Sequence, residues 1–139
     1  GYVYYMAQAL LDKVLGGLAK EDEKAYEILE TYVGTDLEYK EYEPLFACAG
    51  EAAAKQHKKG HFVTCDTYVT MTDGTGIVHI APAYGADDFW AAKAIDQKFP
   101  VLLNVDTYGN FDETVVDFAG RNIFDATGDI IDWLKTNGN

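Results

Sequence analysis

The sequence has 139 residues, of which 48% are hydrophobic and 24% are charged, a composition typical of one globular domain with a core of its own. It carries 23 acidic and 11 basic residues, for a formal net charge of -12, and Arg121 is its single arginine. Because phosphate groups are bound mainly by lysine and arginine, this balance argues against a nucleic-acid partner and against an anionic membrane surface.

The first third of the chain predicts a strand, a helix and one ambiguous segment. Residues 2–5 are aromatic and β-branched, which favours a strand. Residues 7–18 carry one apolar stripe at helical spacing, and we expect Gly16 and Gly17 to fray or stop the last turn of that helix. Residues 26–33, inside an acidic zone, fit helical and strand periodicity alike.

Residues 42–60 predict a short edge strand and the main basic cluster. Residues 42–46 have strand character, and Pro44 confines such a strand to the edge of a sheet. Residues 50–60 form a polar loop or helix. The lysines of this cluster are Lys55, Lys58 and Lys59.

The two strongest strands are predicted on either side of a glycine-bearing turn. Residues 61–71 alternate between two faces, which is the period of a strand. The turn at residues 72–76 then leads to a second strand at residues 77–81, which Pro82 ends.

The last part of the chain alternates helices with extended segments. We expect a helix over residues 85–98, a strand over residues 100–105, a turn at residues 108–110 and a helix over residues 125–135. The whole sequence therefore predicts one α+β domain over residues 1–139, with a barrel-like, strongly curved sheet and about three flanking helices.

Chemistry-bearing residues concentrate in residues 64–88. Gly74 and Gly76 let a backbone approach a ligand closely, and free N–H groups of such a turn can bind a carbonyl or phosphate oxygen. His79 can position or protonate a substrate, and Asp88 can hold a cation.

Each of these residues also has a structural interpretation. Gly74 and Gly76 can simply shape a hairpin turn, and His79 can be a half-buried histidine with its hydrogen bonds satisfied. Asp87 and Asp88 stand at a helix start, where carboxylates cap the helix or complement its dipole.

Neither the cysteines nor the carboxylates indicate a metal or a disulfide. Cys48 and Cys65 are too few for a disulfide framework and lack zinc-ligand spacing, so we expect reduced thiols in a cytoplasmic protein. A nucleophilic pair of Cys65 with His79 is conceivable across paired strands, but the apolar context of Cys65 favours a buried, inert thiol. We expect no metal and no cofactor.

The order of these motifs resembles a known family. The sequence contains FVTCD at residues 62–66, DGTGIVHIAP at residues 73–82 and GADD at residues 85–88, with YEPLF at residues 42–46 and IIDWLK at residues 130–135. This combination closely resembles the inserted editing domain of isoleucyl-tRNA synthetases, which are class I synthetases. The resemblance covers nearly the whole chain and favours a strand over residues 26–33.

The resemblance implies hydrolysis of the ester that joins valine to the isoleucine tRNA. Asp88 would hold the α-ammonium group of the aminoacyl moiety, and His79 would contact the substrate near the ester and the terminal ribose. Water, assisted by the neighbouring ribose hydroxyl, would be the nucleophile, with no metal and no cofactor. The other substrate-binding candidates are Gly74, Thr75, Gly76, Ala81, Pro82, Ala83, Tyr84 and Asp87.

Two departures from the family pattern bear on these expectations. Residues 83–84 are Ala–Tyr where many bacterial members have Gly–His. The family's upstream threonine-rich segment is absent, so we expect a partial editing domain with little activity by itself and with an unpaired sheet edge that favours self-association.

The expected partners are the 3' end of the isoleucine tRNA and the remainder of the synthetase, with no membrane. Lys55, Lys58 and Lys59 are the candidates for RNA contact. Two alternatives stay open: a valyl-type editing domain that clears threonine, which His79 disfavours because the valyl pattern has lysine there, and a non-catalytic module that binds a tRNA end.

Overall fold

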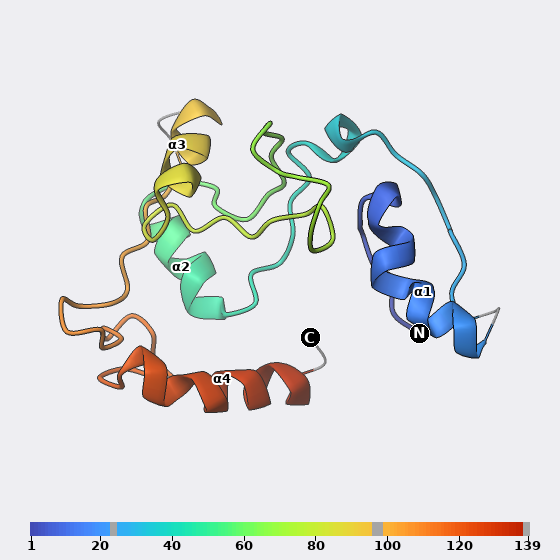
Figure 1. Ribbon diagram of the computed structural model, residues 1–139. Helices are drawn as coiled ribbons and strands as arrows, with labels where there is room; N and C mark the ends of the chain where they lie inside the picture. The colour runs from blue at the N-terminus through green and yellow to red at the C-terminus, as the bar shows by residue number, and fades with distance from the viewer. Residues whose placement is uncertain (23–24, 96–98, 138–139) are drawn as a thin grey trace. The chain divides into compact units, whose positions relative to one another are not determined.

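The computed structural model describes residues 1–22, 25–95 and 99–137. Within these ranges the regular elements are two short 3-10 turns and four α-helices (Figure 1). Their bounds are η1 Gln8–Leu10, α1 Leu11–Glu21, η2 Gly34–Leu37, α2 Ala47–Lys55, α3 Ala86–Ile95 and α4 Ile123–Thr136.

The predicted helices are confirmed, with some changes at their ends. The helix expected over residues 7–18 is η1 followed by α1, and the helix expected over residues 125–135 is α4. The helix expected over residues 85–98 is α3, although residues 96–98 lie outside the described ranges. The alternative left open for residues 50–60 is decided separately for its two halves, because residues 50–55 belong to α2 and residues 56–60 are a turn and a loop.

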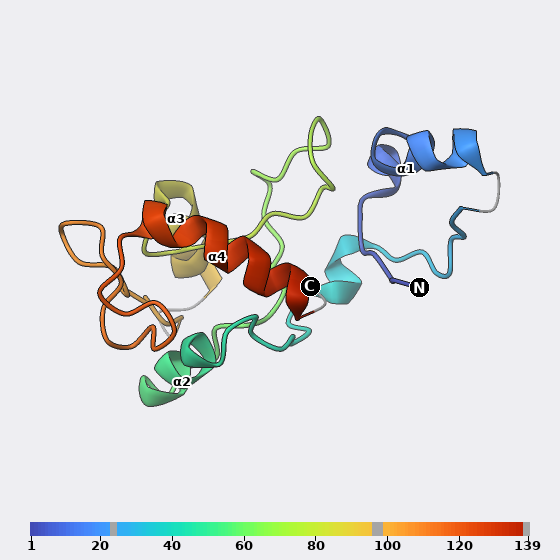
Figure 2. The same ribbon diagram turned by 90° about the horizontal axis from the view of Figure 1, so that it is seen from below.

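The predicted α+β class, with its barrel-like curved sheet, is wrong. No β-strand is found in the described residues. In Figure 2 the segments between the helices are drawn as thin tubes, without the arrows that mark strands. Three isolated β-bridges occur among the described residues, and they join Glu41 with Phe62, Val105 with Phe111, and Asn110 with Asn122. A ladder needs successive pairs, so these bridges do not make a sheet. Because the described residues form no sheet, they have no sheet edge, and the expected self-association through such an edge is not supported.

None of the segments expected as strands forms a strand, and the first two of them are mostly exposed. These segments are residues 2–5, 26–33, 42–46, 61–71, 77–81 and 100–105. Tyr2 is 78% exposed and Ile28 is 59% exposed. Aromatic and β-branched residues favour strands because they pack on a half-buried pleated surface. Where that surface is missing, as around Tyr2 and Ile28, the residue type by itself does not produce a strand.

Contrary to the expectation, the glycine pair in α1 does not stop the helix. The helix continues through Gly16 and Gly17 to its C-cap at Asp22, whose N–H donates to the Leu18 carbonyl oxygen at 3.0 Å. A glycine inside a helix costs only about 1 kcal/mol relative to alanine. The helical hydrogen bonds on either side of the pair are enough to carry α1 across it.

Two compact units divide the chain, and each is described by itself. The first unit comprises Gly1–Glu41 with Phe62–Ala81, and the second comprises Tyr42–His61 with Pro82–Asn139. In the first unit, the N–H of Tyr39 donates to the Val63 carbonyl oxygen at 2.8 Å, and the N–H of Val63 donates to Lys40 at 2.9 Å. These two bonds hold the chain together where the unit's two segments meet.

The second unit has an aromatic core built around α4. Val115, Phe118 and Ala126 are buried together. The ring of Phe46, just before α2, lies 4.7 Å from the Trp133 ring of α4 and meets the Phe118 ring edge-on at 6.5 Å. Aromatic pairs at these distances add to the hydrophobic burial, so they fasten the start of α2 to α4.

The start of α4 is held by a cap and by the only arginine. The Asn122 side chain accepts from the N–H of Phe124 at 3.1 Å. Arg121 donates to the Asp125 carbonyl oxygen at 3.0 Å and forms an ion pair with Asp129 at 2.7 Å. The one arginine of the sequence is therefore engaged in the fold.

The turn predicted at residues 108–110 is confirmed and is bonded to the start of α4, because the N–H of Ile123 donates to the Gly109 carbonyl oxygen at 2.9 Å. Gly109 has a φ of +83°, a left-handed conformation that glycine adopts without strain. Oδ1 of Asp106 accepts from the N–H groups of Tyr108 and Asn110 at 2.8 and 2.9 Å. The backbone hydrogen bond from Asn110 is the main reason that the pKa of Asp106 lies below its usual value.

This lowered pKa predicts a turn that loosens in acid. Because the folded-state pKa lies below the ordinary value of 3.8, the ionised carboxylate stabilises the turn above that pH, and the stabilisation is lost as pH falls through the folded pKa. Titrating the amide shifts of Tyr108 and Asn110 by NMR should give a midpoint below 3.8. In Asp106→Asn that transition should disappear, and a variant that keeps it would contradict the assignment.

Candidate functional site

The glycine-bearing turn at residues 72–76 lies in the first unit. Gly74 and Gly76 have φ values of +65° and +75°, which residues with a Cβ rarely adopt. The N–H of Ala7 donates to the Thr75 carbonyl oxygen at 2.7 Å. A Cβ placed on Gly76 would lie only 2.5 Å from the Cβ of Ala7. Both glycines are therefore required by the backbone of this turn, apart from any ligand that it meets.

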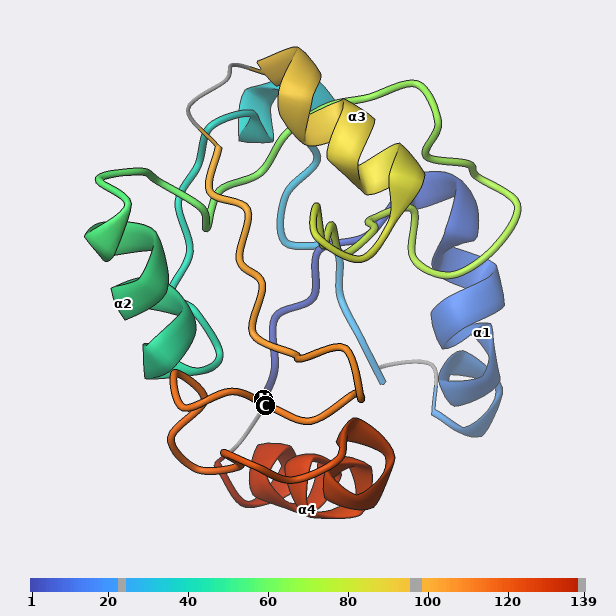
Figure 3. The same cartoon turned by 90° about the vertical axis from the view of Figure 1, so that its left-hand side faces the viewer.

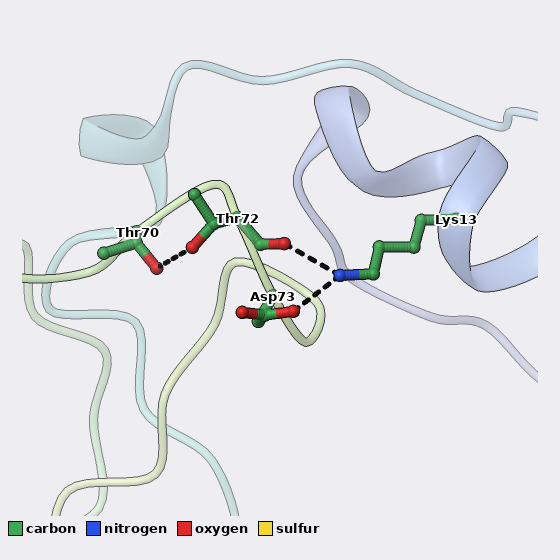
Figure 4. A network of polar contacts seen from close by, with 4 residues as sticks. All are labelled: Lys13, Thr70, Thr72 and Asp73. Carbon is green, nitrogen blue, oxygen red and sulfur yellow. Dashed lines mark hydrogen bonds and ion pairs between the residues drawn. The ribbon is translucent and has the colours of Figure 1, made fainter.

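A lysine of α1 contacts the same turn. Nζ of Lys13 donates to the Thr72 carbonyl oxygen at 2.8 Å and to Oδ1 of Asp73 at 2.6 Å (Figure 4). The hydroxyl oxygens of Thr70 and Thr72 lie 3.0 Å apart on the approach to the turn. The sequence analysis missed Lys13, because no motif or periodicity connects it with a residue 60 positions away.

His79 lies in the extended segment after the turn and is exposed. No hydrogen bond or ion pair to its side chain is found among the described residues, so the interpretation as a half-buried, satisfied histidine does not apply. Cys65 is also exposed, and its thiol donates to the Gly34 carbonyl oxygen at 3.5 Å. The expected burial of Cys65 is wrong, and its thiol is engaged with a backbone carbonyl.

Asp87 and Asp88 lie in the first turn of α3, in the second unit. Asp87 is exposed and Asp88 is half-buried. The Asp88 carboxylate lies close to Gly85, where a Cβ would be 2.5 Å from its Oδ2 atom. A carboxylate at this place complements the positive end of the helix dipole. The position therefore suits a helix-stabilising role, and the carboxylate can also attract a cation.

Tyr84 fixes the turn that precedes α3. Its hydroxyl donates to Oδ1 of Asn104 and accepts from the N–H of Asn104 at 3.1 Å. This pair attaches the turn at residues 82–84 to the segment after residue 99, within the second unit. Tyr84 as a whole is 56% exposed, so these contacts with Asn104 do not bury it.

The basic cluster lies at the end of α2, where the helix runs beside the segment after residue 99 (Figure 3). Nζ of Lys58 donates to the Phe99 carbonyl oxygen at 3.1 Å, and the Gln56 side chain donates to Val101 at 3.3 Å. Lys58 is therefore used to attach α2. Lys55 and Lys59 are exposed.

The sequence-predicted residues thus fall into two groups. Gly74, Thr75, Gly76, His79 and Ala81 belong to the first unit. Pro82, Ala83, Tyr84, Asp87, Asp88 and the three lysines belong to the second. Over the described ranges, no group of three or more His, Cys, Asp or Glu side chains is placed to hold a metal ion. No helix in the described part of the chain is long and apolar enough to span a membrane.

Comparison with known proteins gives one consistent result. The chain is 41% identical over 136 residues to an isoleucine–tRNA ligase of Bdellovibrio bacteriovorus, a match that covers 96% of this chain. It is 37% identical over 129 residues to the cytoplasmic isoleucine–tRNA ligase of Arabidopsis thaliana, covering 91% of the chain. It is 39% identical over 137 residues to the cytoplasmic isoleucine–tRNA ligase of Schizosaccharomyces pombe, covering 93% of the chain. The chain is homologous to a segment of isoleucine–tRNA ligases.

The matched segment is a small part of each relative. The chain spans 12% of the Bdellovibrio ligase, 10% of the Arabidopsis ligase and 12% of the Schizosaccharomyces ligase. No protein-family model matches the chain. The relatives therefore confirm the predicted similarity to isoleucine–tRNA ligases. The role of the segment within such a ligase is treated below as a proposal.

The two glycines of the turn provide a matched pair of substitutions. Gly74→Ala introduces only the strain of a positive φ, about 1–2 kcal/mol, because nothing lies within 4 Å of the point that the new Cβ would occupy. Gly76→Ala adds the clash with Ala7, which we expect to cost about 1–3 kcal/mol more. Chemical denaturation of both variants measures the difference. Equal losses of stability would show that Ala7 and Gly76 are not in contact.

Proposed function

We propose that this chain is part of the editing module of an isoleucine–tRNA ligase, and that this module hydrolyses the ester of valine mischarged onto the isoleucine tRNA. The observation that carries the proposal is that 91–96% of the chain is matched by isoleucine–tRNA ligases at 37–41% identity. The ordered motifs at residues 62–66, 73–82 and 85–88, which resemble the editing domain of that family, support the choice of this activity.

The need for such an activity is physical. An apolar pocket gains only about 1–3 kcal/mol from one methylene, and isoleucyl-tRNA synthetase acting on valine is the standard example of that limit. A second site that admits valine and excludes isoleucine by size multiplies the discrimination. Its substrate is an ester that always carries an α-ammonium group and a terminal ribose.

In the proposed reaction a water oxygen adds to the ester carbonyl carbon. The bond to the ribose oxygen then breaks, and that oxygen leaves with a proton, which gives free valine and a tRNA with a free terminal hydroxyl. Asp88 attracts the α-ammonium group, since a carboxylate suits a cation. His79, which is exposed, contacts the substrate near the ester and the ribose. The reaction then depends on positioning and electrostatics.

The other substrate-binding candidates are backbone and side-chain groups near these two residues in the sequence. The resemblance to the editing domain assigns residues 74–76 and 81–84 to the walls around the aminoacyl group, and Asp87 is next to Asp88 in the sequence. Tyr84, which is 56% exposed, would stack its ring against the terminal adenosine. Within the basic cluster, Lys55 and Lys59 are exposed and Lys58 is half-buried, and all three are proposed for contact with an RNA end.

The proposed partners follow from the substrate. The 3' end of the isoleucine tRNA enters the site, and the remainder of the ligase holds the body of that tRNA. The cytoplasm is the proposed location, supported by the relatives named as cytoplasmic ligases in Arabidopsis and Schizosaccharomyces. A valyl-type module that clears threonine and a module that only binds a tRNA end are the competing functions that the experiment separates.

The experiment measures hydrolysis of valyl- and threonyl-tRNA by the complete ligase. We expect Asp88→Ala to slow hydrolysis of the valyl ester by about 100-fold or more, because the ammonium group loses its counter-charge. Asp125→Ala is the matched control, because it removes a carboxylate from the first turn of α4, and it should leave hydrolysis of the valyl ester unchanged. Hydrolysis that is unchanged in Asp88→Ala would exclude the assigned role of Asp88.

A second variant separates the site role from the helix-capping role. Gly85→Ala keeps the Asp88 carboxylate but pushes its Oδ2 atom away, because the new Cβ would lie 2.5 Å from it. If Asp88 only stabilises α3, both Asp88→Ala and Gly85→Ala will lower the melting temperature and leave hydrolysis intact. Preferred hydrolysis of the threonyl ester, or tRNA binding without any hydrolysis, would replace the proposal by one of its two competitors.

A further inference from the structure

We propose that Lys13 is a positioning residue that holds the glycine-bearing turn of residues 72–76 in the geometry that selects the aminoacyl group. This inference rests on the proposed function, because it concerns the same turn as a wall of the substrate site. Lys13 belongs to α1, and the turn is reached about sixty residues later, so the contact exists only in the folded first unit.

The first observation is the pair of bonds made by one ammonium group. Nζ of Lys13 donates to the Thr72 carbonyl oxygen at 2.8 Å and to Oδ1 of Asp73 at 2.6 Å (Figure 4). One bond is to the backbone and the other is to a side chain of the turn. Lys13 therefore fixes both the path of the chain before Gly74 and the direction of the Asp73 carboxylate.

The second observation is an independent attachment on the other side of Gly74. The N–H of Ala7 donates to the Thr75 carbonyl oxygen at 2.7 Å, and the backbone of Gly76 packs so closely on Ala7 that no Cβ fits there. The turn is held before Gly74 by Lys13 and after Gly74 by Ala7. Gly74 itself has nothing within 4 Å of its side-chain position.

These contacts matter because selection by size depends on a fixed wall. A site that excludes isoleucine and accepts valine distinguishes one methylene, and a displacement of about 1 Å is enough to lose much of such a fit. A glycine-bearing turn without attachments has many conformations open to it. Lys13 touches no reacting atom in this proposal, and it acts on the substrate only through the turn.

The exposure of the ion pair gives the proposal a salt dependence. The side chains of Lys13 and Asp73 are 55% and 85% exposed. Salt screens an exposed ion pair strongly, whereas it weakens a hydrogen bond to a backbone carbonyl less. We therefore expect the turn to loosen, without detaching, as the salt concentration rises.

The experiment compares Lys13→Met, Lys13→Arg and Lys20→Met in the complete ligase. Lys20→Met is the matched control, because it removes a lysine from the last turn of the same helix. The rates measured are hydrolysis of valyl-tRNA and of correctly charged isoleucyl-tRNA, at about 0.05 M and about 0.5 M salt. The melting temperature of each variant is measured beside them.

We expect Lys13→Met to lower the ratio of valyl to isoleucyl hydrolysis by about threefold to tenfold, mainly because hydrolysis of the isoleucyl ester rises. Lys13→Arg, which keeps the charge and the donors, should restore the ratio, and Lys20→Met should leave it unchanged. The gap between wild type and Lys13→Met should narrow at the higher salt concentration.

The possible failures are distinct. If the wild-type ligase hydrolyses neither ester, the proposed function fails. If it hydrolyses the valyl ester and Lys13→Met has the same ratio, the positioning role of Lys13 is overturned and the proposed function stands. If both rates fall together with the melting temperature and Lys13→Arg does not restore them, Lys13 has only a structural role and the inference is likewise overturned.

Discussion

Every backbone N–H and C=O group of the chain needs a hydrogen-bond partner in the protein or in water, and this requirement shapes both units. Helices meet it within their own sequence, as α1 does across its two glycines. Extended segments meet it only with a neighbour, and the described residues offer single contacts such as Tyr39 with Val63. Where a neighbouring group is present, a few such contacts determine the position of a whole segment.

The glycine-bearing turn depends on a small number of such contacts. It lies in an extended part of the first unit, and its position follows from one backbone bond to Ala7 and from the ammonium group of Lys13. The C-terminal part of the second unit is held in the same way, with Asp106 and Asn122 accepting the N–H groups that the turns leave open. Polar side chains here take the place of the hydrogen bonds that a sheet would provide.

The net negative charge excludes fewer kinds of RNA contact than the composition first indicated. A net charge of -12 excludes a broad phosphate-binding surface on this piece. It does not exclude contact with the single-stranded end of a tRNA whose body other parts of a ligase hold. The single arginine stabilises α4, and Lys58 attaches α2, so two of the few cations already serve the fold. Charge therefore limits how tightly this segment would bind RNA by itself.

The sequence by itself predicted α1, α3 and α4, the turn around Gly109, and the similarity to isoleucine–tRNA ligases, because capping, periodicity and motif order are local properties. It left open whether residues 50–60, which contain the end of α2, form a loop or a helix. It also indicated the glycine turn, whose φ values only glycine adopts freely. The prediction of a sheet was wrong, because the strand propensity of residues 2–5 or 61–71 does not determine whether a second segment pairs with them. Only the tertiary structure brought Lys13 to Asp73 and left Cys65 exposed. Contacts between residues about sixty positions apart depend on how the segments pack, and no local pattern records that.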